Sequence, residues 1–172
     1  MRHVFADESK QGNYLFGVSS FAISDMQDAR KTLRSMVMPG QRSIHFGNES
    51  EKRRHHLIDQ ILRLNVGLGI IDTNERNAKL GRDKGLEILV SLAISQEAVM
   101  LVVEKDESAF LSDAQLLKKL IGRRDDCDLR FGISTRHEEP LLWVSDAIAW
   151  CYQRGGLFRR KLIESGVEVS RH

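Results

Sequence analysis

Acidic side chains follow three apolar segments of the chain, and this placement is the first sign of chemistry. Asp7 and Glu8 close the apolar start of the chain, and Asp72 and Glu104 close two later apolar runs. In open α/β sheets, ligands bind outside the carboxyl ends of the strands. If the three segments are parallel strands, their carboxylates share one end of the sheet. Each acid taken alone also fits an ordinary polar turn.

A further carboxylate, Asp146, lies inside an apolar segment with the spacing of a helix. Leu142, Ala149 and Trp150 stand on the same helical face as this acid. An ionised carboxylate that is buried there without a partner costs several kcal/mol. We therefore expect Asp146 either to form a structural salt bridge with an arginine or to ligate a cation, and both alternatives remain open.

Carboxylates with no cysteine beside them suit a hard cation that prefers oxygen ligands, such as Mg²⁺ or Mn²⁺. Two such ions about 4 Å apart can activate a water and stabilise the leaving oxygen when a phosphodiester is hydrolysed. If the sheet brings Asp7 and its neighbours close to Asp146, the sequence predicts a divalent-metal site. Hydrolysis of nucleic acid is the reaction that such a site would serve.

Basic residues are clustered, although the formal net charge of +2 does not by itself indicate a nucleic-acid partner. Two of the runs are Lys52-Arg53-Arg54 and Arg123-Arg124. Such runs would hold a phosphate backbone if the acids cut one, and otherwise they are solvated surface. His45 follows a short apolar segment, where it could contact a phosphate or orient a water, or simply be a half-buried histidine.

The elements that must position these side chains follow from apolar periodicity and turn signals. Residues 1–22 predict a strand, a turn at Gly12 and Asn13, and a second strand. The expected helix N-caps are Ser24, in a capping box with Gln27, then Asn48 or Ser50, and later Ser112. The rest of the chain predicts helices at 24–37, 51–64, 76–96, 112–121, 140–154 and 157–164, and strands at 66–71, 99–103 and 128–133, with 43–46 a short further strand. The order predicts a mixed α/β fold that starts antiparallel and adds parallel strands.

The totals are those of a folded globular protein. The 172 residues are 41% hydrophobic and 29% charged, which predicts one domain over 1–172, with a core from about 3 to 154 and a tail helix at 156–165. No apolar run approaches the roughly 20 residues of a membrane span, and none follows Met1 as in a signal peptide. Cys127 and Cys151 lack metal-ligand spacing and are typical of reduced thiols. We therefore expect a cytoplasmic protein.

Short motifs occur along the chain in the order Phe5-Ala6-Asp7-Glu8-Ser9, Ile44-His45-Phe46, Val102-Val103-Glu104 and Leu142-Trp143-Val144-Ser145-Asp146-Ala147-Ile148-Ala149. This order resembles a widespread prokaryotic family of unknown function with an Asp-Glu-Ser opening. That family belongs to the ribonuclease-H-like superfamily of metal-dependent nucleases and integrases. The resemblance extends from Val4 to about Arg154. Lys10 stands where a glycine is usual, and Trp143 and Ser145 stand where the closing helix usually has Gln and Ala.

The resemblance implies a sheet of about five strands and a nuclease that acts on DNA or RNA with Mg²⁺ or Mn²⁺. It implies carboxylates from the first strand, a middle strand and a C-terminal helix, so Asp7 and Asp146 correspond directly. The middle carboxylate is Asp72 by chain order in the superfamily and Glu104 by local motif, and both remain candidates. Glu8 would be either a third ligand or a residue that supports the ligands without touching the metal. The altered closing motif leaves it open whether the site is active.

A non-catalytic module that binds nucleic acid or protein is the alternative to a nuclease. In that module Asp146 would form a structural salt bridge, while Trp143 and Trp150, on one helical face, would form a homodimer contact. A small-molecule phosphohydrolase is a third function that the same acids allow. Carboxylates of Asp7 and Asp146 within common reach of a metal favour an enzyme. An Asp146 locked against an arginine, with Asp7 remote, favours the module.

Overall fold

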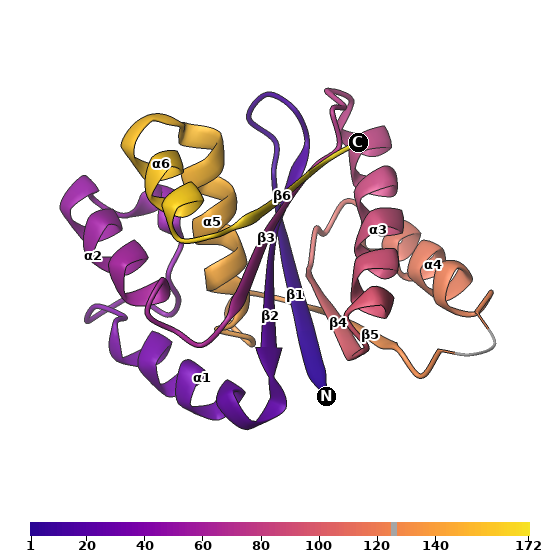
Figure 1. Cartoon of the computed structure of the whole chain (residues 1–172), viewed down its shortest axis with the longest axis horizontal. Coiled ribbons are helices and arrows are strands. Elements are labelled where there is room, and N and C mark those ends of the chain that lie inside the picture. Colours follow the sequence, from indigo (N-terminus) through magenta and orange to yellow (C-terminus); the bar gives the residue numbers. More distant parts are fainter. Residues whose placement is uncertain (125–126) are drawn as a thin grey trace.

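The computed structural model describes residues 1–124 and 127–172, and its centre is a six-stranded sheet with helices on both faces (Figure 1). The strand order is β5-β4-β1-β2-β3-β6. The strands are β1 (Arg2–Ser9), β2 (Leu15–Ala22), β3 (Gly67–Asp72), β4 (Ala98–Glu104), β5 (Arg130–Ser134) and β6 (Glu168–Arg171). The first three strands pair antiparallel, β4 pairs parallel with β1 and β5 with β4, and β6 pairs parallel with β3. The predicted mixed α/β fold is therefore confirmed, with six strands where about five were expected.

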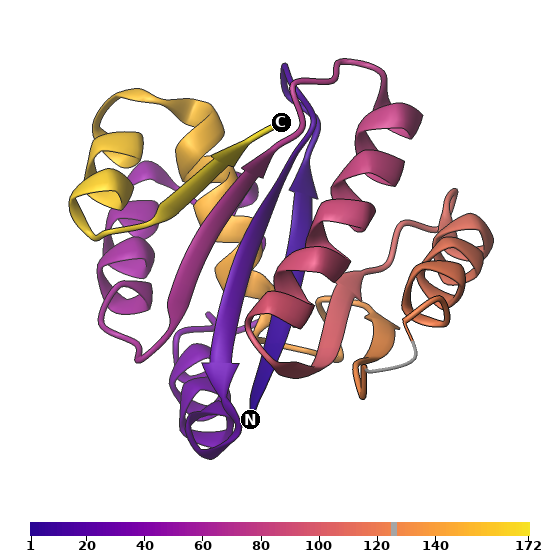
Figure 2. The same ribbon diagram turned by 45° about the vertical axis from the view of Figure 1, so that its right-hand side comes forward.

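Helices cover the two faces of the sheet unequally (Figures 1 and 2). One face carries α1 (Met26–Ser35), α2 (Glu51–Ile61), α5 (Leu142–Arg154) and α6 (Gly156–Glu164), and the other carries α3 (Ala78–Ser95) and α4 (Phe110–Ile121). Short 3-10 turns lie at Ile23–Asp25 and Phe46–Asn48. Each layer has its own buried apolar cluster. None of the helices in the described ranges combines the length and apolar character needed to cross a bilayer.

The middle of the first strand, Val4 to Ala6, is apolar on both sides because both faces of the strand are covered. Phe5 lies in the cluster under α5, whereas Val4 and Ala6 lie in the cluster under α3. Side chains alternate along a strand, so Asp7 continues the Phe5 face and Glu8 continues the other face. Asp7 and Glu8, although adjacent in sequence, therefore lie on opposite faces of the sheet.

The sheet topology brings the predicted strand ends to one side. Two antiparallel steps make β3 parallel to β1, and β4 and β5 are parallel to β1 as well. Asp7, Asp72 and Glu104 therefore lie at the same end of the sheet. Glu104 is on the strand next to β1, whereas β2 stands between β1 and the strand that carries Asp72.

Several local predictions were wrong. Residues 43–46 form no strand, and β6 was not predicted at all. The capping box at Ser24 is absent, because residues Ile23–Asp25 form a 3-10 turn and the Ser24 hydroxyl bonds Asp25 instead. Helix α4 begins at Phe110, before the predicted cap Ser112. The Ser50 cap of α2 is confirmed, since its side chain accepts the Arg53 N–H.

Candidate functional site

A pocket of about 420 Å³ opens at the carboxyl ends of β1 and β4, beside α5. Its walls come from the end of β1 and the following turn, the segment around the second 3-10 turn, the end of β4, the segment before α5, and α5 itself. The charged and aromatic side chains that line it are Asp7, Glu8, Lys10, His45, Glu104, Arg136, Asp146 and Trp150. Four of the predicted acids thus border one pocket, and their orientations decide which of them meet.

Asp7 is placed in the pocket by the close approach of α5 to the sheet. Its register partner on β2 is Gly17. A Cβ at Gly17 would lie 2.1 Å from the Ser145 carbonyl oxygen and 3.0 Å from the Ala149 Cβ, so only glycine lets the helix pack this closely. Asp7 is 3% exposed, and its Oδ1 accepts the Glu8 N–H at 2.8 Å. The helix therefore covers the Asp7 carboxylate and brings its own acid alongside.

Ser145 fixes the position of α5 on the sheet. Its buried hydroxyl donates to the Phe5 carbonyl oxygen at 3.0 Å and lies 3.0 Å from the Ser19 hydroxyl. One side chain thus ties the helix to both β1 and β2. Ser145 therefore supports the position of the neighbouring Asp146.

Asp146 is held from the side of the pocket opposite the sheet. Its Oδ2 accepts the Phe46 N–H at 2.8 Å, and the His45 Nδ1 lies 3.4 Å from the same oxygen. Arg54 braces this segment, because its guanidinium donates to the carbonyl oxygens of Phe46 and Gly47 at 3.1 and 2.6 Å. The backbone amide at Phe46 therefore gives the Asp146 carboxylate a fixed direction into the pocket.

Arg136 lies at the centre of the acids. Its Nε and Nη2 donate to the two carboxylate oxygens of Glu104 at 2.8 and 2.9 Å. Its Nη2 is also 3.8 Å from Asp7 Oδ2, and its Nη1 is 3.7 Å from Asp146 Oδ2. The Trp143 indole N–H donates to the Arg136 carbonyl oxygen at 2.7 Å and so fixes the backbone of this arginine. Acids from β1, β4 and α5 therefore converge on one guanidinium.

The electrostatics of the cluster show too little positive charge for its acids. Burial raises the pKa of Asp7 well above its usual range, and Glu104, Asp146 and Glu8 raise it further. Burial lowers the pKa of Arg136, but the charges of Asp146, Glu104 and Asp7 outweigh that effect and raise it. Three carboxylates face one guanidinium, so a further cation would relieve the repulsion among them.

Two predicted ligands lie outside this convergence. Asp72 accepts the Asn74 N–H at 3.0 Å and does not line the pocket, so it is a turn residue at the same end of the sheet. Glu8 turns to the other face of β1, where its carboxylate lies 2.8 Å from Arg82 Nη1 and 3.3 Å from Lys10 Nζ. Of the two candidates for the middle acid, the structure brings Glu104 to Asp7.

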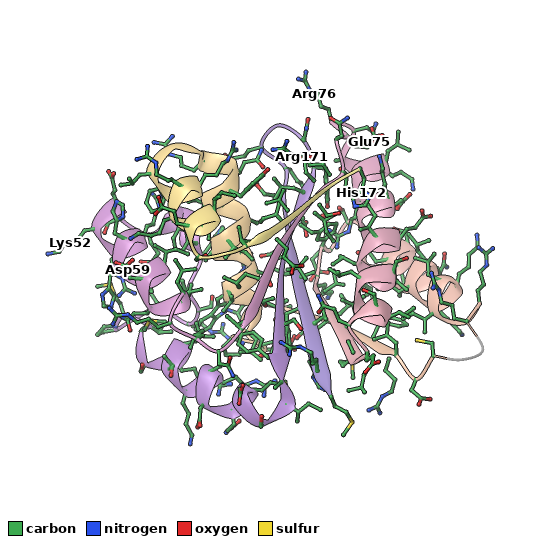
Figure 3. The ribbon with its side chains drawn as sticks, viewed as in Figure 1. Lys52, Asp59, Glu75, Arg76, Arg171 and His172 are labelled. Atoms are coloured by element: carbon green, nitrogen blue, oxygen red, sulfur yellow. The ribbon has the colours of Figure 1, made fainter. Side chains whose placement is uncertain are left out.

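The predicted phosphate-binding residues also lie away from the pocket, except for His45. The Arg53 guanidinium bonds Glu49 and the Met36 carbonyl oxygen, and Arg54 braces the backbone as described. Lys52 points outward from the far edge of α2 (Figure 3). The other run, Arg123 and Arg124, follows the end of α4. Helix α4 connects the parallel strands β4 and β5, so it starts at the end of the sheet that carries Glu104 and finishes at the opposite end. The run therefore lies at the far end of the sheet from the pocket.

Arg136 was not among the candidate residues predicted from the sequence. The one available signal was its position shortly after β5, at the sheet end that also carries Glu104. The roles of Trp143 and Ser145 were missed as well, because each depends on a contact with another part of the chain.

The donor set fits a hard divalent cation, because Asp7, Glu104 and Asp146 offer only carboxylate oxygens. Within the described ranges, no three His, Cys, Asp or Glu side chains stand in an arrangement that could hold a metal ion. The Arg136 guanidinium lies among these three carboxylates. The acids are therefore the right kind of ligand, and a metal would require this guanidinium to move.

Without metal, the contribution of Asp7 to the stability of the protein should fall as pH rises. The folded state holds the Asp7 proton more tightly than the unfolded state, so its contribution is full below the unfolded pKa of about 4 and is lost as pH rises through the raised folded pKa. Asp7→Asn keeps an oxygen that accepts the Glu8 N–H and does not titrate. In EDTA, we expect this variant to melt several degrees above the wild type at about pH 8 and to show a flatter pH profile. If the melting temperatures of the two proteins changed with pH in parallel, the destabilising effect assigned to the Asp7 charge would be contradicted.

Comparisons with known proteins give a fold and no family. No family model matches the chain, and no curated protein matches it. Among solved structures, ribonuclease HII from Archaeoglobus fulgidus, in its complex with PCNA, is similar with a TM-score of 0.61 and 15% sequence identity. The similarity covers 96% of this chain and 79% of that one. At this identity the likeness shows the fold alone, which is ribonuclease-H-like.

Proposed function

We propose that this protein is a divalent-metal-dependent nuclease that hydrolyses phosphodiester bonds in DNA or RNA. The observation that supports it most is the convergence of Asp7, Glu104 and Asp146, from three separate elements, in one open pocket. The ribonuclease-H-like fold, shared with a solved ribonuclease HII, agrees with this proposal.

In this proposal Asp7, Glu104 and Asp146 hold Mg²⁺ or Mn²⁺. A metal bound there would polarise a phosphoryl oxygen and activate the attacking water. The chain fixes two of the ligands in advance, since Asp7 accepts the Glu8 N–H and Asp146 accepts the Phe46 N–H. Ligands that are already oriented lose little conformational freedom when they bind a cation.

The rim of the pocket offers contacts for a phosphate. The His45 side chain is 47% exposed beside Asp146, where it can donate a hydrogen bond to a phosphate oxygen or orient a water. Lys10 lines the same pocket while it pairs with Asp106 at 2.7 Å. We assign phosphate contact to these two residues, and to Arg53 and Arg54 only the indirect role of bracing the segment before α2.

A non-catalytic binding module is the second candidate, and one observation favours it. Arg136 already gives the acids a positive partner from within the chain. The predicted dimer contact receives no support, since Trp143 is 2% exposed and Trp150 packs against Phe46 and Phe158 within the same chain. A cleavage assay is therefore needed to distinguish a binding module from a nuclease.

The test is cleavage of labelled single- and double-stranded DNA and RNA in Mn²⁺ by wild type, Asp7→Asn and Asp146→Asn. Loss of either ligand should lower the rate by about a hundredfold or more, because metal stabilisation of the transition state is worth several kcal/mol. Asp72→Asn is the matched control, since it makes the same change at the same sheet end outside the pocket. Its rate should remain near that of wild type.

Equal cleavage by all four proteins would place the activity in another centre or in a contaminant and would contradict the proposal. No cleavage of any substrate would favour the binding module. Hydrolysis of mononucleotides in a parallel panel, without cleavage of the polymers, would identify a small-molecule phosphohydrolase instead.

A further inference from the structure

The guanidinium of Arg136 occupies the position that a cation would take among the acids. It is the group common to all three carboxylates, at 2.8 Å from Glu104, 3.8 Å from Asp7 and 3.7 Å from Asp146. It supplies one positive charge where the three acids carry up to three negative ones. Arginine is therefore a partial substitute for a divalent ion in this cluster.

The contacts of Arg136 are unequal, and this makes its guanidinium displaceable. Only Glu104 receives hydrogen bonds from it, in a two-pronged pair, while Asp7 and Asp146 lie beyond hydrogen-bond distance. Its Nη1 is buried and has no hydrogen-bond partner among the described residues. A buried donor without a partner costs free energy, so the position that suits Glu104 is a poor one for the rest of the guanidinium.

The surroundings let the side chain leave while the backbone remains. The Trp143 indole holds the Arg136 carbonyl oxygen, which anchors the loop. The side chain of Arg136 is 23% exposed and lines the open pocket, so it can swing toward solvent without unfolding of the core. A partly exposed arginine side chain on a fixed backbone is suited to exchange with a diffusible cation.

We propose that Arg136 is a resident counter-cation that competes with the divalent metal for Glu104, Asp7 and Asp146, and so sets the metal affinity of the site. The inference rests on the proposed metal site and adds a residue that limits its loading. When the competing side chain must first leave, the apparent affinity falls by the fraction of molecules in which it has left.

The test measures Mn²⁺ binding directly, by isothermal titration calorimetry with no nucleic acid present. Arg136→Gln should bind Mn²⁺ about tenfold more tightly than wild type or better, because the competing charge is gone. Arg136→Lys keeps the charge but loses the two-pronged grip on Glu104, so we expect a smaller gain. Lys105→Gln is the matched control, since it removes a positive charge next to Glu104 from a lysine that pairs with Glu107 outside the cluster. Its affinity should stay close to that of wild type.

Melting temperatures with and without Mn²⁺ show whether a change in Mn²⁺ affinity comes from a folding defect of the variant. Arg136→Gln leaves the acids without a partner, so it should melt below wild type in EDTA and gain more stability from Mn²⁺. If this variant does not fold in either condition, Arg136→Lys decides, and an unchanged affinity overturns the inference. Wild type that binds Mn²⁺ with no gain in either variant overturns the inference alone. Absence of Mn²⁺ binding in every protein overturns the proposed metal site with it.

Discussion

Replacement of Arg82 by methionine is expected to lower the free energy of unfolding by about 3–5 kcal/mol, as when one partner of a buried ion pair is removed. Arg82 is 4% exposed on α3 and grips Asp113, which is 1% exposed on α4, through Nε and Nη2 at 2.7–3.0 Å. Its Nη1 lies 2.8 Å from Glu8, and its Nη2 donates to the Glu104 carbonyl oxygen at 3.3 Å. The variant would strand the Asp113 charge in the core and release the two strands that carry the site. Urea denaturation measures the loss.

The control for Arg82 removes both buried charges. Arg82→Met combined with Asp113→Leu should be more stable than Arg82→Met alone, because the unpaired Asp113 carboxylate is gone while Glu8 keeps its contact with Lys10. Mn²⁺ affinity should fall in the single variant, since the ends of β1 and β4 lose their common support. A loss below about 1 kcal/mol for Arg82→Met would contradict this view, because it would rank the pair with exposed salt bridges.

Gly17→Ala is expected to cost about 3 kcal/mol, at the upper end of the overpacking range, and to lower the melting temperature by about 10 °C. The added Cβ would stand 2.1 Å from the Ser145 carbonyl oxygen, which is backbone and cannot rotate away. Helix α5 must then lift from the sheet, which breaks the Ser145 bond to Phe5 and carries Asp146 away from Asp7. Stability and Mn²⁺ affinity should therefore fall together.

Gly132→Ala provides the comparison for this helix contact. Gly132 also lies in a strand, β5, and a Cβ there meets nothing within 4 Å, so the substitution should be close to neutral for both stability and Mn²⁺ affinity. Thermal melts and calorimetry on the two variants distinguish the effect of the α5 contact from the general effect of replacing a strand glycine by alanine. A Gly17→Ala protein that is as stable as Gly132→Ala and binds Mn²⁺ as wild type does would show that close packing of α5 is not required.

The mixed sheet could be predicted because most of its strands are runs of apolar residues between clear turns. Strand β6 could not, since Glu168–Arg171 is short, mostly exposed, and pairs only with the edge of β3. The segment 43–46 was wrongly predicted as a strand because its burial alternates as it does in a strand. Ile44 and Phe46 are buried on either side of the exposed His45, which imitates a strand although no strand lies beside them.

The candidate site was predictable only in part. Asp7 and Asp146 stood out, one at the end of an apolar strand and one inside an apolar helix, and the structure brings them together. The middle acid could not be chosen from sequence, because Asp72 and Glu104 both end strands and only the strand order separates them. Arg136 carried no signal beyond its position after β5, since its role exists only where the three elements meet.

The most direct test of the site is a crystal soaked in MnCl₂ and measured near the manganese absorption edge. We predict an anomalous peak in the pocket about 2 Å from carboxylate oxygens of Asp7, Glu104 and Asp146, with the Arg136 side chain turned away from Glu104. A crystal at saturating Mn²⁺ that shows no peak in this pocket, with Arg136 still bound to Glu104, would contradict the metal site on which the proposed function depends.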